Sequence, residues 1–272
     1  MSTTLTTQHA ISRDGTAIGA HVTGSGSPFV LLHGSAADGT RWAPIREQLA
    51  EHHTVHTVDR RGRGLSGDSA DYSIEREYED LAAYVDALEE PAIVLGHSYG
   101  AVIALEAMRL TANVTSLVLY EPPLPVGIEI YEPSLVARLE ALLAAGDRDG
   151  LLTTFMREVP RVPEAHIETM RAQATWDARV AAAHTIPREL RAVNELEGGV
   201  RARFAGMDVR TLLLVGGASP AFLTEASRAL AGALPDSRTA VFAGHGHSAM
   251  DTATAEFVDQ VLGFAEGAAA QR

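Results

Sequence analysis

The chain contains neither cysteine nor lysine among its 272 residues. Without cysteine there can be no disulfide, no thiolate nucleophile and no Cys-ligated zinc site. Without lysine, a Schiff-base intermediate and the lysine of a phosphate-binding P-loop are excluded as well. These two absences remove pyridoxal-phosphate chemistry and P-loop ATP hydrolysis from the possible functions.

The chain also lacks long apolar runs and an excess of positive charge. No run reaches the 18 apolar residues or so that a membrane-spanning helix requires. The first 15 residues are polar and lack the apolar core of a secretory signal, so we expect a cytoplasmic protein. A net charge of −13 disfavours nucleic acid and anionic membranes as partners.

The chain is rich in short apolar runs that alternate with amphipathic stretches. Hydrophobic residues make up 46% of the sequence, which is enough to fill one large core. A hairpin is expected first, with its turn at Asp14-Gly15. Further strands are expected at residues 29–32, 54–58, 92–95, 116–120, 211–215 and 239–242. Helical patterns separate most of these runs, and such alternation predicts an α/β fold with a mostly parallel sheet and helices on both faces.

The alternation stops between Pro122 and Gly206. No strong strand pattern occurs there, and Leu135, Leu139 and Leu142 recur at helical spacing. A segment of this length is too long for a simple strand-to-helix loop. We therefore expect a core domain formed by residues 1–121 and 206–272, with a helical cap inserted at residues 122–205.

The strongest chemical signal is Gly96-His97-Ser98-Tyr99-Gly100, which follows an apolar strand and opens a helix. This is the G-x-S-x-G nucleophile elbow in the context it requires. The turn is tight enough to exclude side chains two residues before and after the serine. Ser98 is therefore the candidate nucleophile, although the five-residue pattern alone also occurs by chance.

Main-chain amides near this serine are candidates for an oxyanion hole. His33-Gly34-Ser35 ends an earlier strand, and the N–H of Ser35, or alternatively of Gly34, would supply one donor. The N–H of Tyr99, at the start of the helix, would supply the other. An ordinary turn at the end of a strand would account for His33-Gly34-Ser35 equally well.

A histidine that could act as base follows the last expected strand, in Gly244-His245-Gly246-His247-Ser248. The order nucleophile, acid, histidine along the chain is that of G-x-S-x-G hydrolases. We favour His247, with His245 as the competitor. A metal site is disfavoured because no carboxylate or cysteine lies close by in the sequence.

These motifs and their order resemble those of the α/β-hydrolase superfamily over nearly the whole chain. The stretch from Asp59 to Ser66 is similar to that superfamily's loop after the fourth strand, and we expect it to be structural. The resemblance implies an eight-stranded α/β-hydrolase fold with a helical cap and no cofactor.

The acid of the triad departs from the usual pattern. Where most of these hydrolases have Asp after the strand at 211–215, this chain has Ser219, which cannot stabilise an imidazolium. Glu121 follows the preceding strand at the same sheet edge as Ser98. The fungal zearalenone-lactone hydrolases are similar in having Glu there, and this favours Glu121 as the acid. Glu225 and Asp251 are the alternatives.

The residues expected to line a substrate pocket come from the cap. They are Leu124, Ile128, Met156, Trp176 and Val180, most of which could instead belong to the cap's own core. Their apolar character favours a small apolar ester or lactone as substrate.

The predicted function is hydrolysis of a carboxylic ester or lactone through a Ser-His-Glu triad and an acyl-enzyme. Two other functions remain open at this point, because one fold hosts many chemistries. One is a cofactor-free perhydrolase, lyase or C–C bond hydrolase, and the other is a low-turnover protein that binds a small molecule.

Overall fold

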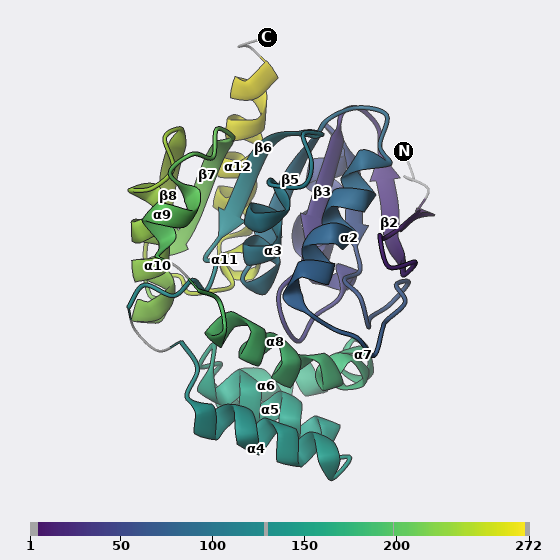
Figure 1. Ribbon diagram of the computed structural model, residues 1–272, viewed down its shortest axis with the longest axis vertical. Helices are drawn as coiled ribbons and strands as arrows, with labels where there is room; N and C mark the ends of the chain where they lie inside the picture. Colours follow the sequence, from purple (N-terminus) through teal and green to yellow (C-terminus); the bar gives the residue numbers. More distant parts are fainter. Residues whose placement is uncertain (1–4, 128–129, 198, 270–272) are drawn as a thin grey trace.

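The structure, a computed structural model, describes residues 5–127, 130–197 and 199–269. Figure 1 shows a twisted sheet with helices on its two faces and a separate layer of helices at one end. Ile128, one of the residues predicted to contact substrate, lies outside the described residues.

A single eight-stranded sheet forms the centre of the molecule. Its strand order is β1-β2-β4-β3-β5-β6-β7-β8. The strands are β1 (Thr6–Ile11), β2 (Ala17–Gly24), β3 (Pro28–Leu32), β4 (Thr54–Val58), β5 (Ala92–His97), β6 (Val114–Tyr120), β7 (Arg210–Gly216) and β8 (Ser237–Phe242).

The sheet is parallel except at one edge. The β1 strand pairs antiparallel with β2, β2 pairs antiparallel with β4, and every other pairing is parallel. The predicted mostly parallel, eight-stranded fold is therefore confirmed.

Helices connect the parallel strands and cover both faces (Figure 1). Those around the sheet are α1 (Ala43–Ala50), α2 (Ile74–Asp86), α3 (Tyr99–Ala107), α10 (Ala221–Ala231), α11 (Ala249–Thr252) and α12 (Thr254–Ala269). The α2 helix packs on α3, and α1 packs on α12.

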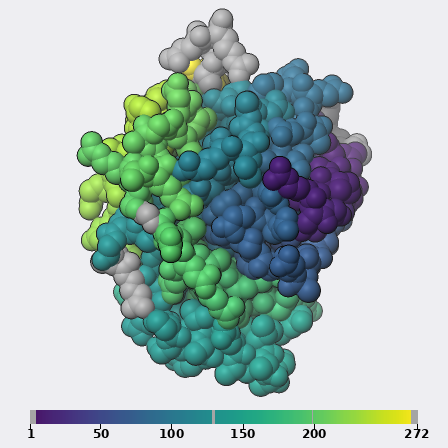
Figure 2. Space-filling view, viewed as in Figure 1, coloured from purple at the N-terminus to yellow at the C-terminus, as the bar shows by residue number. Residues whose placement is uncertain are grey.

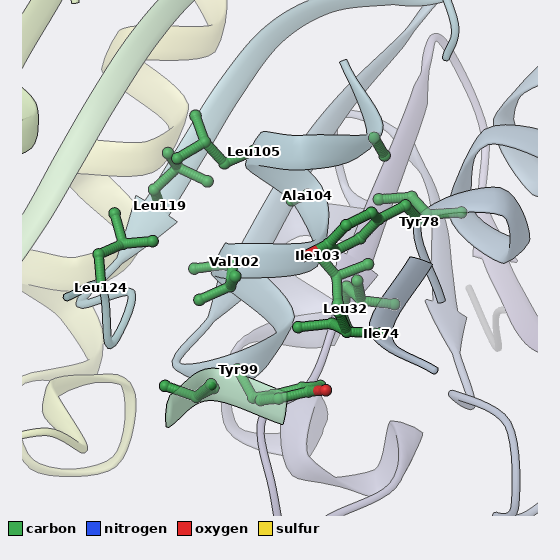
Figure 3. Close-up of a cluster of buried hydrophobic side chains, with 14 of the residues drawn as sticks. Leu32, Ile74, Tyr78, Tyr99, Val102, Ile103, Ala104, Leu105, Leu119 and Leu124 are labelled. Atoms are coloured by element: carbon green, nitrogen blue, oxygen red, sulfur yellow. The ribbon is translucent and has the colours of Figure 1, made fainter. Parts of the chain in front are cut away.

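The two faces of the sheet are buried in two separate hydrophobic clusters. Successive side chains of a strand point to opposite faces, so Val30 and Leu32 of β3 enter one cluster while Phe29 and Leu31 enter the other. Figure 3 shows the first cluster, in which side chains of α3 meet Leu32 and Leu119. Burial on both faces explains why these strands are continuous apolar runs.

The segment between β6 and β7 is helical. Its helices are α4 (Pro133–Ala144), α5 (Arg148–Glu158), α6 (Glu164–Arg171), α7 (Trp176–Ala182), α8 (Ile186–Asn194) and α9 (Val200–Phe204), with a short 3-10 turn at Ala183–Thr185. Figure 2 shows the teal helices of this segment closing over one end of the molecule. We call the segment from α4 to α8 the cap.

A buried ionic cluster joins the cap to the core. Arg60 donates to both carboxylate oxygens of Glu77 on α2, at 2.8 Å each, and to Glu189 on α8 at 2.9 Å. Arg63 also pairs with Glu189. Burial opposes ionisation of Glu189, but the two guanidinium groups outweigh it and hold the pKa of this carboxyl below its usual range.

The loop that carries these arginines is fixed by Asp59. Its Oδ1 accepts the N–H of Gly39 at 2.7 Å, and its Oδ2 accepts the N–H of Leu65 at 2.8 Å. This agrees with the structural role predicted for the loop from Asp59 to Ser66.

Two glycines allow the tight turn between β5 and α3. A Cβ on Gly96 would lie 2.5 Å from the carbonyl oxygen of Gly100, and a Cβ on Gly100 would overlap the carbonyl oxygens of Leu32 and His33. Because all of these neighbours are backbone atoms, they cannot move aside as a flexible side chain could. The elbow therefore depends on glycine at both positions.

Replacing Gly100 with Ala is expected to lower the free energy of unfolding by about 2–3 kcal/mol, because the added methyl overpacks rigid backbone. Gly263→Ala is the control, since Gly263 lies exposed in α12 with no atom within 4 Å of an added Cβ. It should stabilise the helix by roughly 0.5–1 kcal/mol. Urea unfolding measures both changes, and equal midpoints for the two variants would contradict this account.

Replacing Glu189 with Gln is expected to lower the free energy of unfolding by about 3 kcal/mol, because two buried guanidinium groups lose their shared carboxylate. Arg138→Gln is the control, because Arg138 and Glu158 form an exposed pair that should contribute less than about 1 kcal/mol. A shift for Glu189→Gln no larger than the control's would show that the cluster does not hold the cap on the core.

Candidate active site

The candidate triad residues Ser98 and Glu121 follow adjacent parallel strands. His97, the last residue of β5, is in register with Tyr120, the last residue of β6. Each of the two residues comes directly after its strand, so both backbones lie side by side at the carboxyl edge of the sheet. Ligands and catalytic groups gather at this edge in open α/β sheets.

Ser98 occupies a strained backbone position at the start of α3. Its φ of 55° and ψ of −123° lie in a region that residues other than glycine rarely adopt. Its N–H donates to the carbonyl of Tyr120 at 2.8 Å, which continues the β5–β6 pairing through the turn. This backbone turns the serine side chain out of the sheet and into a cavity.

Glu121 is fully buried and accepts three hydrogen bonds. Its Oε1 accepts the N–H of Gly216 at 2.8 Å, and its Oε2 accepts the Ser219 hydroxyl at 2.9 Å. The same Oε2 lies 2.5 Å from Nδ1 of His247. Because a carboxylate can only accept, Nδ1 of His247 is the donor, which leaves Nε2 free to accept a proton.

Glu121 also has a positive φ of 50°, a value that residues other than glycine rarely adopt. A residue held in this region costs of order 1–3 kcal/mol and persists only where its surroundings fix it. The three hydrogen bonds supply that constraint. Ser219, at the position where Asp is usual, thus helps to hold the carboxylate that lies one strand away.

The rival residues are placed differently. Asp251 is bound by Arg41 through both carboxylate oxygens, at 2.8 and 2.7 Å, and Glu225 is exposed on α10. His245 is directed to the Thr252 hydroxyl, 2.8 Å from its Nδ1. Of the candidate bases and acids, only His247 and Glu121 form a pair among the described residues.

Ser98 and His247 line the same cavity. Among the described residues, no hydrogen bond joins their side chains. The loop of His247 is fixed by two residues that the motif analysis left without a role. His97 Nε2 lies 2.9 Å from the carbonyl of His247, and the Tyr120 hydroxyl donates to Gly246 while accepting the N–H of Ala249.

His97 must donate from Nε2, because its partner is a carbonyl oxygen. Burial, aided by the nearby His247, lowers the pKa of His97 well below its usual value, so the ring stays neutral. The x position before the serine in the motif therefore has a positioning role here. Only its place inside the motif, next to Ser98, could have drawn attention to His97 in the sequence.

The loop of Gly34 and Ser35 lies directly against Ser98. A Cβ on Gly34 would be 2.9 Å from the Ser98 Cβ, so a side chain there is excluded. The Gly34 carbonyl accepts from His33 Nδ1 at 2.8 Å and from Arg60 Nη1 at 3.1 Å. The carbonyl and amide of one trans peptide point in opposite directions, so these two donors turn the N–H of Ser35 away from Arg60.

His33 is neutral and has one defined tautomer. Its Nε2 accepts the N–H of Arg60 at 3.1 Å, so the proton resides on Nδ1. Burial, together with Arg63 and Arg60, lowers the pKa of this imidazole well below its usual value. The third candidate of this region, Tyr99, begins α3, whose first amides have no partner within the helix.

A cavity of about 760 Å³ opens over Ser98 and His247. Met156, one of the predicted pocket residues, lines it. Leu124, Trp176 and Val180 are not part of its wall as far as the described residues form it. Leu124 packs in the hydrophobic cluster of Figure 3, and Trp176 donates from Nε1 to Asp149 within the cap.

Other residues of the cavity wall were not singled out from the sequence. The apolar ones include Phe155, Val159, Val162, Met170, Phe222 and Leu223. Two arginines, Arg41 and Arg179, also line it near Ser98 and His247. Their chain separation from the motifs is large, so no local pattern could have assigned them to the site.

Within the described part of the chain, no group of three His, Asp or Glu residues is arranged to hold a metal ion. No helix of the described residues is long and apolar enough to cross a membrane.

Comparison with known proteins gives several relatives. Over 96 residues the chain is 38% identical to a pimeloyl-[acyl-carrier protein] methyl ester esterase of Xanthomonas oryzae. The matched segment covers 35% of this chain and 37% of the relative. An esterase of the same name from Aliivibrio salmonicida is 41% identical over 91 residues, 33% of each chain. The chain thus spans little more than a third of the length of these curated relatives.

Solved structures match over most of their length. An alpha/beta hydrolase from Sphaerobacter thermophilus is 39% identical, with a TM-score of 0.76 over 86% of this chain and 91% of that one. The esterase RhEst1 from a Rhodococcus species is 25% identical, with a TM-score of 0.77 over 97% and 98% of the two chains.

The sequence model of the Alpha/beta hydrolase family matches residues 29–260, which include the nucleophile elbow, the buried glutamate and the histidine loop. With this match over most of the chain and the Sphaerobacter thermophilus relative, this protein belongs to the α/β-hydrolase family.

Proposed function

We propose that the protein is a serine hydrolase that cleaves a carboxylic ester or lactone, with Ser98, His247 and Glu121 as its triad. The observation that carries the proposal is the hydrogen bond from His247 to the fully buried Glu121 beneath a cavity that Ser98 also lines. Esterases among the relatives and the structural neighbours support the same reaction class.

Acylation begins when Ser98 Oγ attacks the substrate carbonyl carbon and its proton passes to Nε2 of His247. Glu121 stabilises the imidazolium formed in this step. His247 then gives the proton to the leaving alkoxide as the ester C–O bond breaks. Water attacks the resulting acyl-enzyme with His247 again as base, which releases the acid and restores Ser98.

The hydrogen bond between a catalytic serine and its histidine base is often long before the substrate binds, and it tightens in the reacting complex. We therefore propose that the hydrogen bond between Ser98 and His247 forms when the substrate binds. The backbone at both positions is already fixed by the hydrogen bonds to Tyr120 and His97.

The oxyanion of the tetrahedral intermediate would be bound by the amides of Ser35 and Tyr99. One support is the Gly34 carbonyl, which accepts from His33 and Arg60 and thereby turns the Ser35 N–H away from Arg60. The other is the start of α3, where the first backbone N–H groups have no partner within the helix. Two preorganised donors of this type are each worth about 3 kcal/mol in the transition state. Gly34 acts through its lack of a side chain.

The pocket favours a substrate with an apolar body. The apolar residues of its wall outnumber the charged ones, and Met156 and Phe155 come from the cap. A volume of about 760 Å³ suits a molecule of moderate size. The likeness of Glu121 to the acid of zearalenone-lactone hydrolases keeps a lactone within the proposed substrates.

Replacing Ser98 or His247 with Ala is expected to lower kcat for a 4-nitrophenyl ester by about a thousandfold or more, because nucleophile and base act as one unit. His245→Ala is the matched control and should stay within a few-fold, since His245 is half-buried and its Nδ1 is bound to the Thr252 hydroxyl. Initial rates of nitrophenol release measure the effect. Substantial turnover by Ser98→Ala would refute the nucleophile.

Replacing Glu121 with Gln is expected to lower kcat by roughly a thousandfold with the fold retained, because the amide can hold the wrong imidazole tautomer. Ser219→Ala removes one hydrogen bond to the carboxylate and should cost about tenfold or less. Glu225→Gln, on exposed α10, is the control and should match the parent. Kinetics and a thermal melt of each variant test this, and a fully active Glu121→Gln would rule out the glutamate as triad acid.

A further inference from the structure

Arg179 is a charged residue of the cavity wall for which the proposed reaction has no use. It lies on α7 of the cap and lines the same cavity as Ser98 and His247. Its Nη1 donates to the carbonyl of Ala36 at 3.1 Å. Ala36 comes directly after Gly34 and Ser35, the loop that lies against Ser98. That single bond places the guanidinium at the point where the cap meets the catalytic edge of the sheet.

No carboxylate of the described residues forms an ion pair with Arg179. Asp251 is the acid of the cavity wall, and Arg41 already binds both of its oxygens. Asp38 and Asp251 both favour the charged form of Arg179, but neither forms an ion pair with it, and Asp38 accepts from Thr40. A guanidinium has five N–H donors, and the described residues account for one of them.

The environment of Arg179 disfavours an isolated positive charge. Burial lowers the pKa of this guanidinium, and the neighbouring Arg41 acts in the same direction. Because arginine stays protonated in proteins, this unfavourable environment makes an added negative charge stabilising. The protein as a whole carries −13, yet three arginines (Arg41, Arg161 and Arg179) and one aspartate line the cavity.

We infer that Arg179 binds a carboxylate on the substrate, so that the enzyme prefers esters of an apolar body that carries one carboxylate. The planar fork of a guanidinium matches the two oxygens of a carboxylate. This inference rests on the proposed esterase function and narrows its substrate class.

The test compares esters that differ only in charge. One pair is the phenyl half-ester of adipic acid and its methyl-capped form, with the carboxylate on the acyl side. The other is 4-acetoxybenzoate and 4-acetoxybenzamide, with the carboxylate on the alcohol side. We expect kcat/KM for the charged member of at least one pair to exceed that of its neutral partner by about tenfold or more.

Arg179→Gln should abolish that preference, mainly by raising KM for the charged ester, and should leave the neutral ester within about threefold. Arg238→Gln removes the same charge from an exposed position near the amino end of β8, at the sheet edge opposite the site. It should keep the preference of the parent, which separates a local contact from the loss of net charge.

Equal rates for charged and neutral esters, or an equal loss on both in Arg179→Gln, would overturn the inference and leave the esterase intact. In the second case Arg179 would serve only to hold the Ala36 carbonyl. Ester cleavage that survives in Ser98→Ala would instead overturn the proposed function. If no ester is turned over, calorimetry measures the binding of adipate to the parent and to Arg179→Gln. Weaker binding to the variant would support the carboxylate site, and equal binding to both proteins would refute it.

Discussion

The buried carboxylate of Glu121 is the interaction on which the catalytic edge of the sheet depends. A buried charge is unfavourable unless it is fully hydrogen-bonded. Here Gly216, Ser219 and His247 satisfy it from three points on the later part of the chain. The carboxylate thereby ties β6 to the β7 turn and to the histidine loop, and the same bonds that satisfy it fix the orientation of His247.

A second buried network acts on the other side of the nucleophile. Arg60 binds the Gly34 carbonyl and the carboxylates of Glu77 and Glu189 at the same time. One guanidinium therefore connects the loop of Gly34 and Ser35, α2 of the core and α8 of the cap. Because the N–H donors of the Arg60 guanidinium lie in a fixed plane, a shift of the cap would change the hydrogen bond from Arg60 to the Gly34 carbonyl. The position of the cap and the geometry of the loop beside Ser98 are linked by this residue.

The sequence carried strong information wherever the physical cause is local. Apolar runs bounded by glycine predicted the buried strands, and the glycines around Ser98 predicted the turn, because backbone overlap at Gly96 and Gly100 is decided within a few residues. Pocket residues were harder to predict. Trp176 and Val180 have the apolar character expected of a pocket, yet a cap helix buries apolar residues against its neighbours just as readily.

The sequence by itself determined the α/β fold, the turn that presents Ser98 and a short set of histidines and acids, since each depends on hydrophobic periodicity or on glycine at fixed spacing. Only the tertiary structure decided which members of that set meet. The bond between His247 and Glu121 joins residues 126 positions apart, and it depends on the register that places the carboxyl ends of β6, β7 and β8 side by side. Likewise, Arg179 faces the cavity because α7 packs over the sheet edge, and no spacing along the chain encodes that long-range contact.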